Sequence, residues 1–116
     1  MNQNEQIQHV ELSLDEAKKA VDFGEAIQRL EKNADFKKVI LDGYFSDESR
    51  RLTFLTADTS LDDKSSNAVW AGLRAIGELR SFLLGRKAMA EVAKKEVLDF
   101  QETLEELREE DAGGEE

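Results

Sequence analysis

The second half of the chain carries apolar residues at a regular seven-residue spacing. Between residues 76 and 107 these positions form two neighbouring rows. Such a pattern gives a long helix a narrow apolar seam, which a second helix must cover. We therefore predict a coiled-coil-like helix over about residues 61–111. The first row is Ile76, Leu83, Ala90, Val97 and Leu104, and the second row is Leu79, Ala93, Phe100 and Leu107.

The seam changes character along this helix. Between residues 70 and 84 further large apolar residues flank it, which is typical of a helix in a domain core. From Ala90 onward it is a narrow stripe between charged faces, and we expect it to be exposed there and to contact another chain. Gly85 and Arg86 mark the change, because Arg86 occupies a seam position. The candidate interaction residues of the seam are Leu83, Ala90, Val97, Phe100, Leu104 and Leu107.

A capping box marks the start of the first predicted helix. Ser13 and Glu16 have the spacing at which each side chain satisfies a backbone donor near the helix start, so we expect a helix from about Leu14. Residues 1–12 are polar and weakly patterned, and we expect them to be poorly ordered. Gly24 weakens the helix interior, and we expect a pause there. The residues expected to face inward are Ala17, Val21, Phe23, Ile27 and Leu30.

A second helix is expected after a break near Asn33, a residue that tolerates the left-handed geometry of a helix end. Asp35 offers its N-cap, and the helical pattern continues through about Thr56. Alternatively, Gly43 ends this helix and Ser46 caps a separate one. The expected apolar face consists of Phe36, Val39, Ile40, Gly43, Tyr44, Leu52 and Leu55.

These elements predict an all-α fold: an antiparallel helical hairpin or bundle of three to four helices with a long C-terminal coiled-coil-like helix. Ser60 and Asp63 again have cap spacing, which starts the long helix near Leu61. The expected organisation is a poorly ordered segment over residues 1–12, a single helical domain over 13–111 and a flexible acidic tail over 112–116. The absence of proline and the 36% of charged residues are typical of long solvated helices.

The net charge of −10 is concentrated at the C-terminal end. Residues 97–116 hold nine acidic residues and one basic residue, Arg108, whereas the rest of the chain is nearly balanced. Such a segment either keeps the protein solvated or contacts a basic protein. Arg80, Lys87, Lys94 and Arg108 share one flanking heptad position, which suits pairing with acidic residues across a helical interface. The candidate acidic interaction residues are Glu102, Glu105, Glu106, Glu109, Glu110 and Asp111.

Residue types that common catalytic mechanisms need are scarce. The chain has one histidine, His9, and no cysteine, so Ser-His, Cys-His and zinc arrangements lack their components. The oxygen-rich residues 58–63 lack the glycine and glutamate that an EF-hand requires. We predict no enzymatic activity, no cofactor and no metal ion.

Nucleic-acid and membrane partners are also disfavoured. The acidic net charge argues against direct nucleic-acid binding. No run approaches the roughly 20 apolar residues of a membrane span, and the N-terminus lacks the pattern of a secretory signal. We therefore expect a cytoplasmic protein whose partners are other proteins, including copies of itself.

Several short runs of the chain form a recognisable set: Asn33-Ala34-Asp35-Phe36, residues 40–45 (ILDGYF), Arg51-Leu52, residues 75–82 (AIGELRSF) and the Glu/Leu/Arg-rich residues 104–110. This set resembles small helical proteins encoded by tailed bacteriophages, over about residues 25–110. The resemblance implies a viral origin and a role in virion assembly or host takeover, in the host cytoplasm or in the virion. It implies no catalytic residue.

Two functions are therefore expected. The first is a non-enzymatic phage structural or assembly protein, head-associated or scaffold-like, that forms a homo-oligomer through its long C-terminal helix. The alternative is a phage-encoded inhibitor or adaptor. It would bind a basic host protein, such as a polymerase or a nucleic-acid-handling defence enzyme, through the acidic C-terminal helix. A basic virion protein is a further expected partner.

Overall fold

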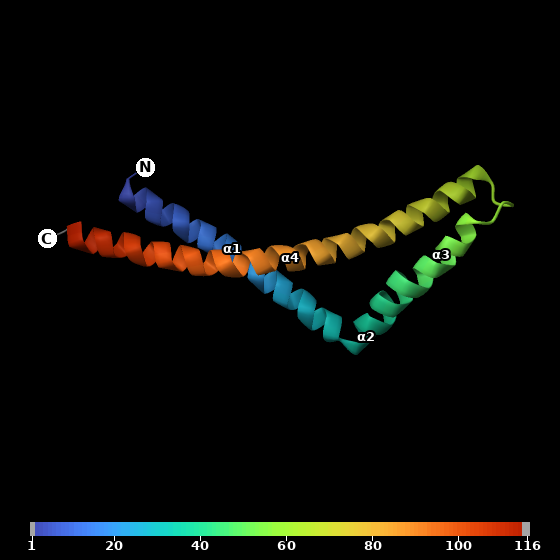
Figure 1. Cartoon of the computed structure of the whole chain (residues 1–116), viewed down its shortest axis with the longest axis horizontal. Helices are drawn as coiled ribbons and strands as arrows, with labels where there is room; N and C mark the ends of the chain where they lie inside the picture. Colours follow the sequence, from blue (N-terminus) through green and yellow to red (C-terminus); the bar gives the residue numbers. More distant parts are fainter. Residues whose placement is uncertain (1, 115–116) are drawn as a thin grey trace. The chain divides into compact units, whose positions relative to one another are not determined.

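The computed structural model describes residues 2–114, and these residues form helices joined by short connections (Figure 1). The elements are α1 (Gln3–Lys32), α2 (Ala34–Phe36), η1 (Lys37–Glu48), α3 (Ser49–Thr56) and α4 (Asp63–Gly114). The all-α prediction is confirmed for the described residues, as is the long C-terminal helix, which has 52 residues.

Helix α1 begins much earlier than the capping-box spacing predicted. The Asn2 side chain caps it, because its Oδ1 accepts a hydrogen bond from the Glu5 backbone N–H at 2.8 Å. Ser13 therefore lies inside the helix, and the expected start near Leu14 is wrong. Residues 3–12, expected to be poorly ordered, are helical. Gln3 gives a physical reason, since its Nε2 donates a hydrogen bond to the Leu107 carbonyl at 2.8 Å.

The break near Asn33 is confirmed, but its geometry differs from the expected one. Asn33 is extended, with φ of −69° and ψ of 128°, and is not left-handed. Its side chain accepts a hydrogen bond from the Phe36 N–H at 3.0 Å, so Asn33 and not Asp35 is the N-cap of the next helix. An asparagine in extended geometry is a favourable N-cap, which accounts for the difference.

Element η1 is a π-helix, in which each backbone N–H donates to the carbonyl five residues earlier. Its half-buried residues lie mainly in groups four positions apart. Val39, expected to face inward from α-helical spacing, is 62% exposed. Helices α2, η1 and α3 follow one another without a break, so the alternative in which Ser46 caps a separate helix is wrong. The half-buried residues of η1 are Ile40, Leu41, Gly43, Tyr44, Phe45 and Glu48, and they are flanked by the half-buried Phe36 of α2 and Ser49 of α3.

The turn before α4 is organised by two aspartates. Asp58 Oδ1 accepts hydrogen bonds from the Ser60 N–H and the Ser60 hydroxyl, at 2.9 and 2.6 Å. Asp62 Oδ1 accepts from the Ser65 N–H at 2.7 Å, so Asp62 is the N-cap of α4 in place of the expected Ser60. These hydrogen bonds favour the ionised carboxylates and lower the pKa of Asp58 and of Asp62.

Replacing Asp62 with alanine should lower the melting temperature at neutral pH, because the cap of α4 is lost. Since the pKa of Asp62 is lowered in the folded state, its stabilisation is present above the ordinary value of 3.8 and disappears as pH falls through the lowered value. Thermal unfolding of both proteins, followed by circular dichroism at pH 7 and pH 2, measures this. Asp62→Asn is the control, because asparagine also caps helices but does not titrate. A difference between wild type and Asp62→Ala that is equally large at pH 2 would contradict the assignment.

Helix α4 continues to Gly114, so the helix break expected at residue 112 is wrong. Glu115 and Glu116, the last part of the expected flexible tail, lie outside the described residues. The acidic residues before them therefore project from a helix, at fixed helical spacing.

The described residues fall into two compact units. Unit 1 contains residues 2–26 and 86–114, and unit 2 contains residues 27–85. In Figure 1 the blue half of α1 lies along the orange-to-red half of α4, and these segments form unit 1. Both long helices contribute to both units. The expectation of a single helical domain over residues 13–111 stays a prediction.

The core of unit 2 lies between α3 and the first half of α4. Leu52, Val69 and Ile76 are buried together there. Gly72 permits a close approach, because a Cβ atom at this position would lie 3.0 Å from Leu52 Cδ1. Trp70 lies outside this core and is 55% exposed. Half-buried residues packed against the core are Tyr44, Phe45, Leu55, Leu61 and Leu73.

Candidate interaction surface on unit 1

A second heptad pattern, on α1, faces the seam of α4 within unit 1. Residues of α1 at two heptad positions are all buried or half-buried. Two contacts show how this part of α1 lies against α4. Near its start, Gln3 forms a hydrogen bond with Leu107, and further along, Gly24 lies against Ala90. The seam is therefore covered by a helix of the same chain. This pattern was missed because residues 1–12 were expected to be disordered, although the spacing alone could have revealed it. Its members are Ile7, Leu14 and Val21 in one row, and Val10, Ala17 and Gly24 in the other.

The expectation that the seam is exposed from Ala90 onward is wrong. Ala90, Ala93 and Leu104 are each 4% exposed. Val97, Phe100 and Leu107 are half-buried in unit 1, and Leu83 is half-buried in unit 2. The physical reason is the α1 heptad, which supplies the apolar face that the seam needs. Contact of these six residues with another chain stays a prediction.

Gly24 allows α1 and α4 to approach closely. A Cβ atom at this position would overlap the Cβ atom of Ala90 and lie 3.7 Å from the Ala90 Cα. The expected pause at Gly24 is wrong, because α1 is continuous through this residue. Small side chains at the neighbouring contact positions, Ala17 and Ala93, are also buried. Glycine therefore has a packing role here.

One side of the α1–α4 pair carries many charged residues. Arg108 donates to Glu11 across the two helices at 3.1 Å, and Lys94 pairs with Glu91 along α4 at 2.9 Å. The hollow on this side has a volume of about 330 Å³, and four of its seven lining residues are charged. The Arg108 contact agrees with the expected pairing of the flanking basic row with acidic residues across a helical interface. The lining residues are Lys18, Val21, Asp22, Glu25, Lys94, Val97 and Leu98.

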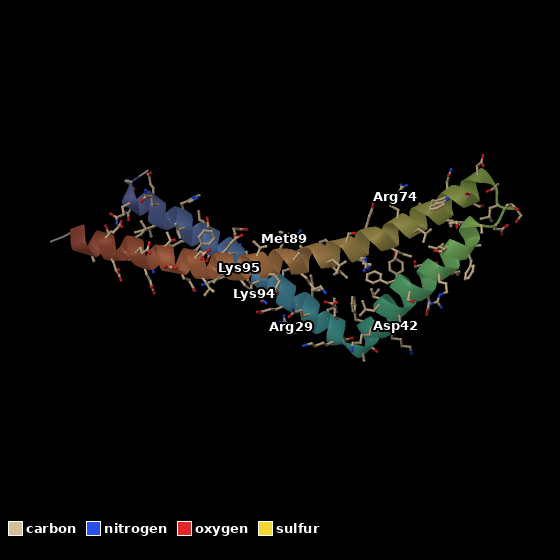
Figure 2. All side chains as sticks on the ribbon, in the orientation of Figure 1. Arg29, Asp42, Arg74, Met89, Lys94 and Lys95 are labelled. Carbon is tan, nitrogen blue, oxygen red and sulfur yellow. The ribbon has the colours of Figure 1, made fainter. Side chains whose placement is uncertain are left out.

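The opposite side of the pair is a larger groove, with a volume of about 660 Å³, and seven of its eleven lining residues are apolar. Phe23, Met89 and Val92 line it and are 44%, 52% and 58% exposed. Figure 2 labels Met89 on this stretch of α4. Phe23 was expected to face inward but lies on this groove, beneath the Arg86 guanidinium, which is 5.6 Å from the ring centroid. We call this surface the apolar groove; its remaining residues are Glu16, Ala17, Lys19, Ala20, Ala88, Ala93 and Glu96.

The acidic candidates lie on the last four turns of α4. All of them are exposed, and Arg108, the only base of this segment, is paired with Glu11. Their spacing of three and four residues places several carboxylates on one helical face. This face can attract a basic partner, and salt screens such attraction. The residues are Glu102, Glu105, Glu106, Glu109, Glu110 and Asp111.

The perturbed carboxyl groups have local structural causes. The pKa of Glu48 is lowered by its side-chain hydrogen bond with Arg51 one turn later, and those of Asp58 and Asp62 by the turn before α4. His9 is exposed on α1. Within residues 2–114, no group of three or more His, Cys, Asp or Glu residues is arranged to hold a metal ion.

Unit 2 has a hollow of its own, of about 640 Å³, between η1 and α4. Val39, Ile40, Tyr44 and Leu79 line it. Leu79 belongs to the second row of the seam and is 36% exposed. Among the helices of the described region, none combines the length and apolar character needed to cross a membrane.

Comparison with known proteins gives no relative. No protein-family model matches the chain, and neither does any curated protein or solved structure. The resemblance to small phage proteins therefore stays a prediction that rests on the short runs quoted above.

Proposed function

We propose that this chain is a non-enzymatic assembly protein of a tailed bacteriophage, head-associated or scaffold-like, that self-associates through its long C-terminal helix. In this proposal α1 and α4 form an antiparallel hairpin, and association of copies completes a helical bundle. The protein acts in the host cytoplasm or in the virion, and it needs no cofactor. Its partners are copies of itself and basic virion proteins.

The apolar groove is the observation that supports this proposal. After α1 has covered the seam, α4 still exposes about half of Met89 and of Val92. Phe23 of α1 borders the same surface. Helix pairs normally bury such side chains against further helices, as in four-helix bundles. Exposed apolar surface on one defined side of a helix pair is also typical of association sites.

Replacing Val92 with lysine should weaken self-association by about tenfold or more, because a charged group would have to leave water at the interface. Analytical ultracentrifugation of the full chain over a wide concentration range measures this. Leu98→Lys is the matched control. Leu98 is also an exposed apolar residue of α4, 67% exposed, but it lies on the charged side. In both variants the new lysine has a glutamate four residues later, Glu96 or Glu102. At position 98 it also follows Lys94 by four residues, so the helix content of both variants is compared by circular dichroism.

The outcomes separate the two functional classes. Association that Val92→Lys weakens and Leu98→Lys leaves unchanged supports the proposal. A wild-type chain that stays monomeric at every concentration contradicts it and favours the alternative, an inhibitor or adaptor that binds a basic host protein. The exposed acidic face of α4, with its base already paired to Glu11, is the observation that favours this second candidate.

A further inference from the structure

The apolar groove has a basic end and an acidic end. Arg86 lies at the end where α1 contributes Phe23, and Glu16 and Glu96 lie among the residues of the other end. Arg86 and Glu96 are ten residues apart on one helix, a separation of about 15 Å. Lys19 pairs with Glu16 at 3.7 Å on the α1 wall, where both side chains are highly exposed. The apolar residues Met89 and Val92 lie between the charged ends.

We infer that the apolar groove binds the same groove of a second copy of this chain, related by a two-fold axis perpendicular to the groove. This symmetry places Arg86 opposite the partner's Glu96 and, by the same operation, Glu96 opposite the partner's Arg86. Met89 and Val92 then meet their own equivalents near the axis. The inference rests on the proposed self-association and specifies its surface and polarity.

Charge complementarity is the reason why a second copy of the chain fits this groove. A groove that carries one charge sign at each end is complementary to itself when one copy is reversed, and each favourable pair then occurs twice in an isologous dimer. In the parallel arrangement Arg86 would face the partner's Arg86, and like charges at an interface are unfavourable. Close approach of the two copies is sterically possible, because the accessible part of the groove wall includes the small residues Ala20 and Ala88.

Charge reversal in the full chain tests this polarity. Arg86→Glu and Glu96→Arg should each raise the dimer dissociation constant by about tenfold at low salt, because each creates two like-charged contacts across the axis. The double variant Arg86→Glu/Glu96→Arg should return to within about threefold of wild type, since both contacts are again between opposite charges. Sedimentation equilibrium at about 50 mM and about 500 mM salt measures the dissociation constants. The differences between variants should shrink at the higher concentration, because salt screens the charge pairs.

Restoration in the double variant cannot arise within one chain, because about 15 Å separates the two positions along α4. Arg86→Glu also removes the contact with Phe23, so thermal unfolding at low concentration is recorded for each variant. Weakened single variants with a restored double variant support the inference. Single variants with unchanged dissociation constants, as expected for a parallel dimer, overturn it.

The remaining outcomes distinguish failure of the groove pairing from failure of the proposed function. A double variant as weak as the single variants overturns the pairing, although self-association sensitive to Val92→Lys would leave the proposed function intact. A wild-type chain that never associates overturns both. A dimer that Val92→Lys does not affect overturns the assignment of the groove and leaves association through another surface.

Discussion

Gly24→Ala is expected to lower the free energy of unfolding by about 2 kcal/mol, because its new methyl group would overlap that of Ala90. The two helices of unit 1 would have to move apart, and buried contacts of Ala17 and Ala93 would loosen. Alanine is a better helix former than glycine, so helix propensity alone predicts the opposite sign. Urea unfolding followed by circular dichroism distinguishes the two.

Two controls isolate the contact. Gly77→Ala and Gly85→Ala add a methyl group to α4 where nothing lies within 4 Å, so each should stabilise the chain by about 0.5–1 kcal/mol. The double variant Gly24→Ala/Ala90→Gly moves the methyl group from one helix to the other and should recover most of the loss. A Gly24→Ala protein as stable as Gly77→Ala would show that α1 and α4 do not approach at this point.

Ile76→Ala should destabilise unit 2 by about 3 kcal/mol, the range observed when a large aliphatic side chain is removed from a core. Ile76 is 5% exposed and contacts the cluster formed with Leu52 and Val69. Trp70, the single tryptophan of the chain, lies in this unit, so its fluorescence can follow the unfolding of unit 2 directly.

Val39→Ala is the control for this substitution, and it should change stability by less than about 0.5 kcal/mol because Val39 is largely exposed. It also probes the π-helix. With α-helical spacing Val39 would belong to the inward face, and its truncation would then cost an appreciable part of the Ile76 effect. If Val39→Ala and Ile76→Ala lowered the free energy of unfolding equally, the packing described for η1 and for α4 would be contradicted.

The seam of α4 could be predicted from sequence because heptad spacing directly reports which residues share a helical face. Ile76, Ala90 and Leu104 of this seam are buried. The identity of the covering helix could not be assigned, because a seam does not specify whether its partner belongs to the same chain. The missed heptad from Ile7 to Gly24 contains this information, but its first turns are dominated by polar residues.

The π-helix could not be predicted from α-helical periodicity. The adjacent pairs Ile40–Leu41 and Tyr44–Phe45 are half-buried together. A π-helix turns by a smaller angle per residue than an α-helix, so the two members of each pair lie closer together on one face. The helix starts at Asn2 and Asp62 were missed for another reason, since tertiary contacts and turn geometry choose among several plausible caps.

The candidate interaction surface could be predicted only in part. The sequence indicated which residues form the seam, but the exposed positions beside it depend on the side from which α1 approaches. Met89 and Val92 remain accessible, whereas Ala90 and Ala93 between them are covered. The acidic residues from Glu102 to Asp111 could be located directly, because charge density does not depend on packing.

The order in which the chain is made has a consequence for unit 1. Its two segments are separated by the whole of unit 2, and the bond from Gln3 to Leu107 spans 104 positions. Contacts of this separation carry a high loop-closure entropy and form late. During synthesis the apolar row of α1 therefore cannot be covered until the last part of α4 has been translated. Until then Ile7, Leu14 and Val21 have no covering helix within the chain, and we expect exchange of α1 between copies to compete with correct folding.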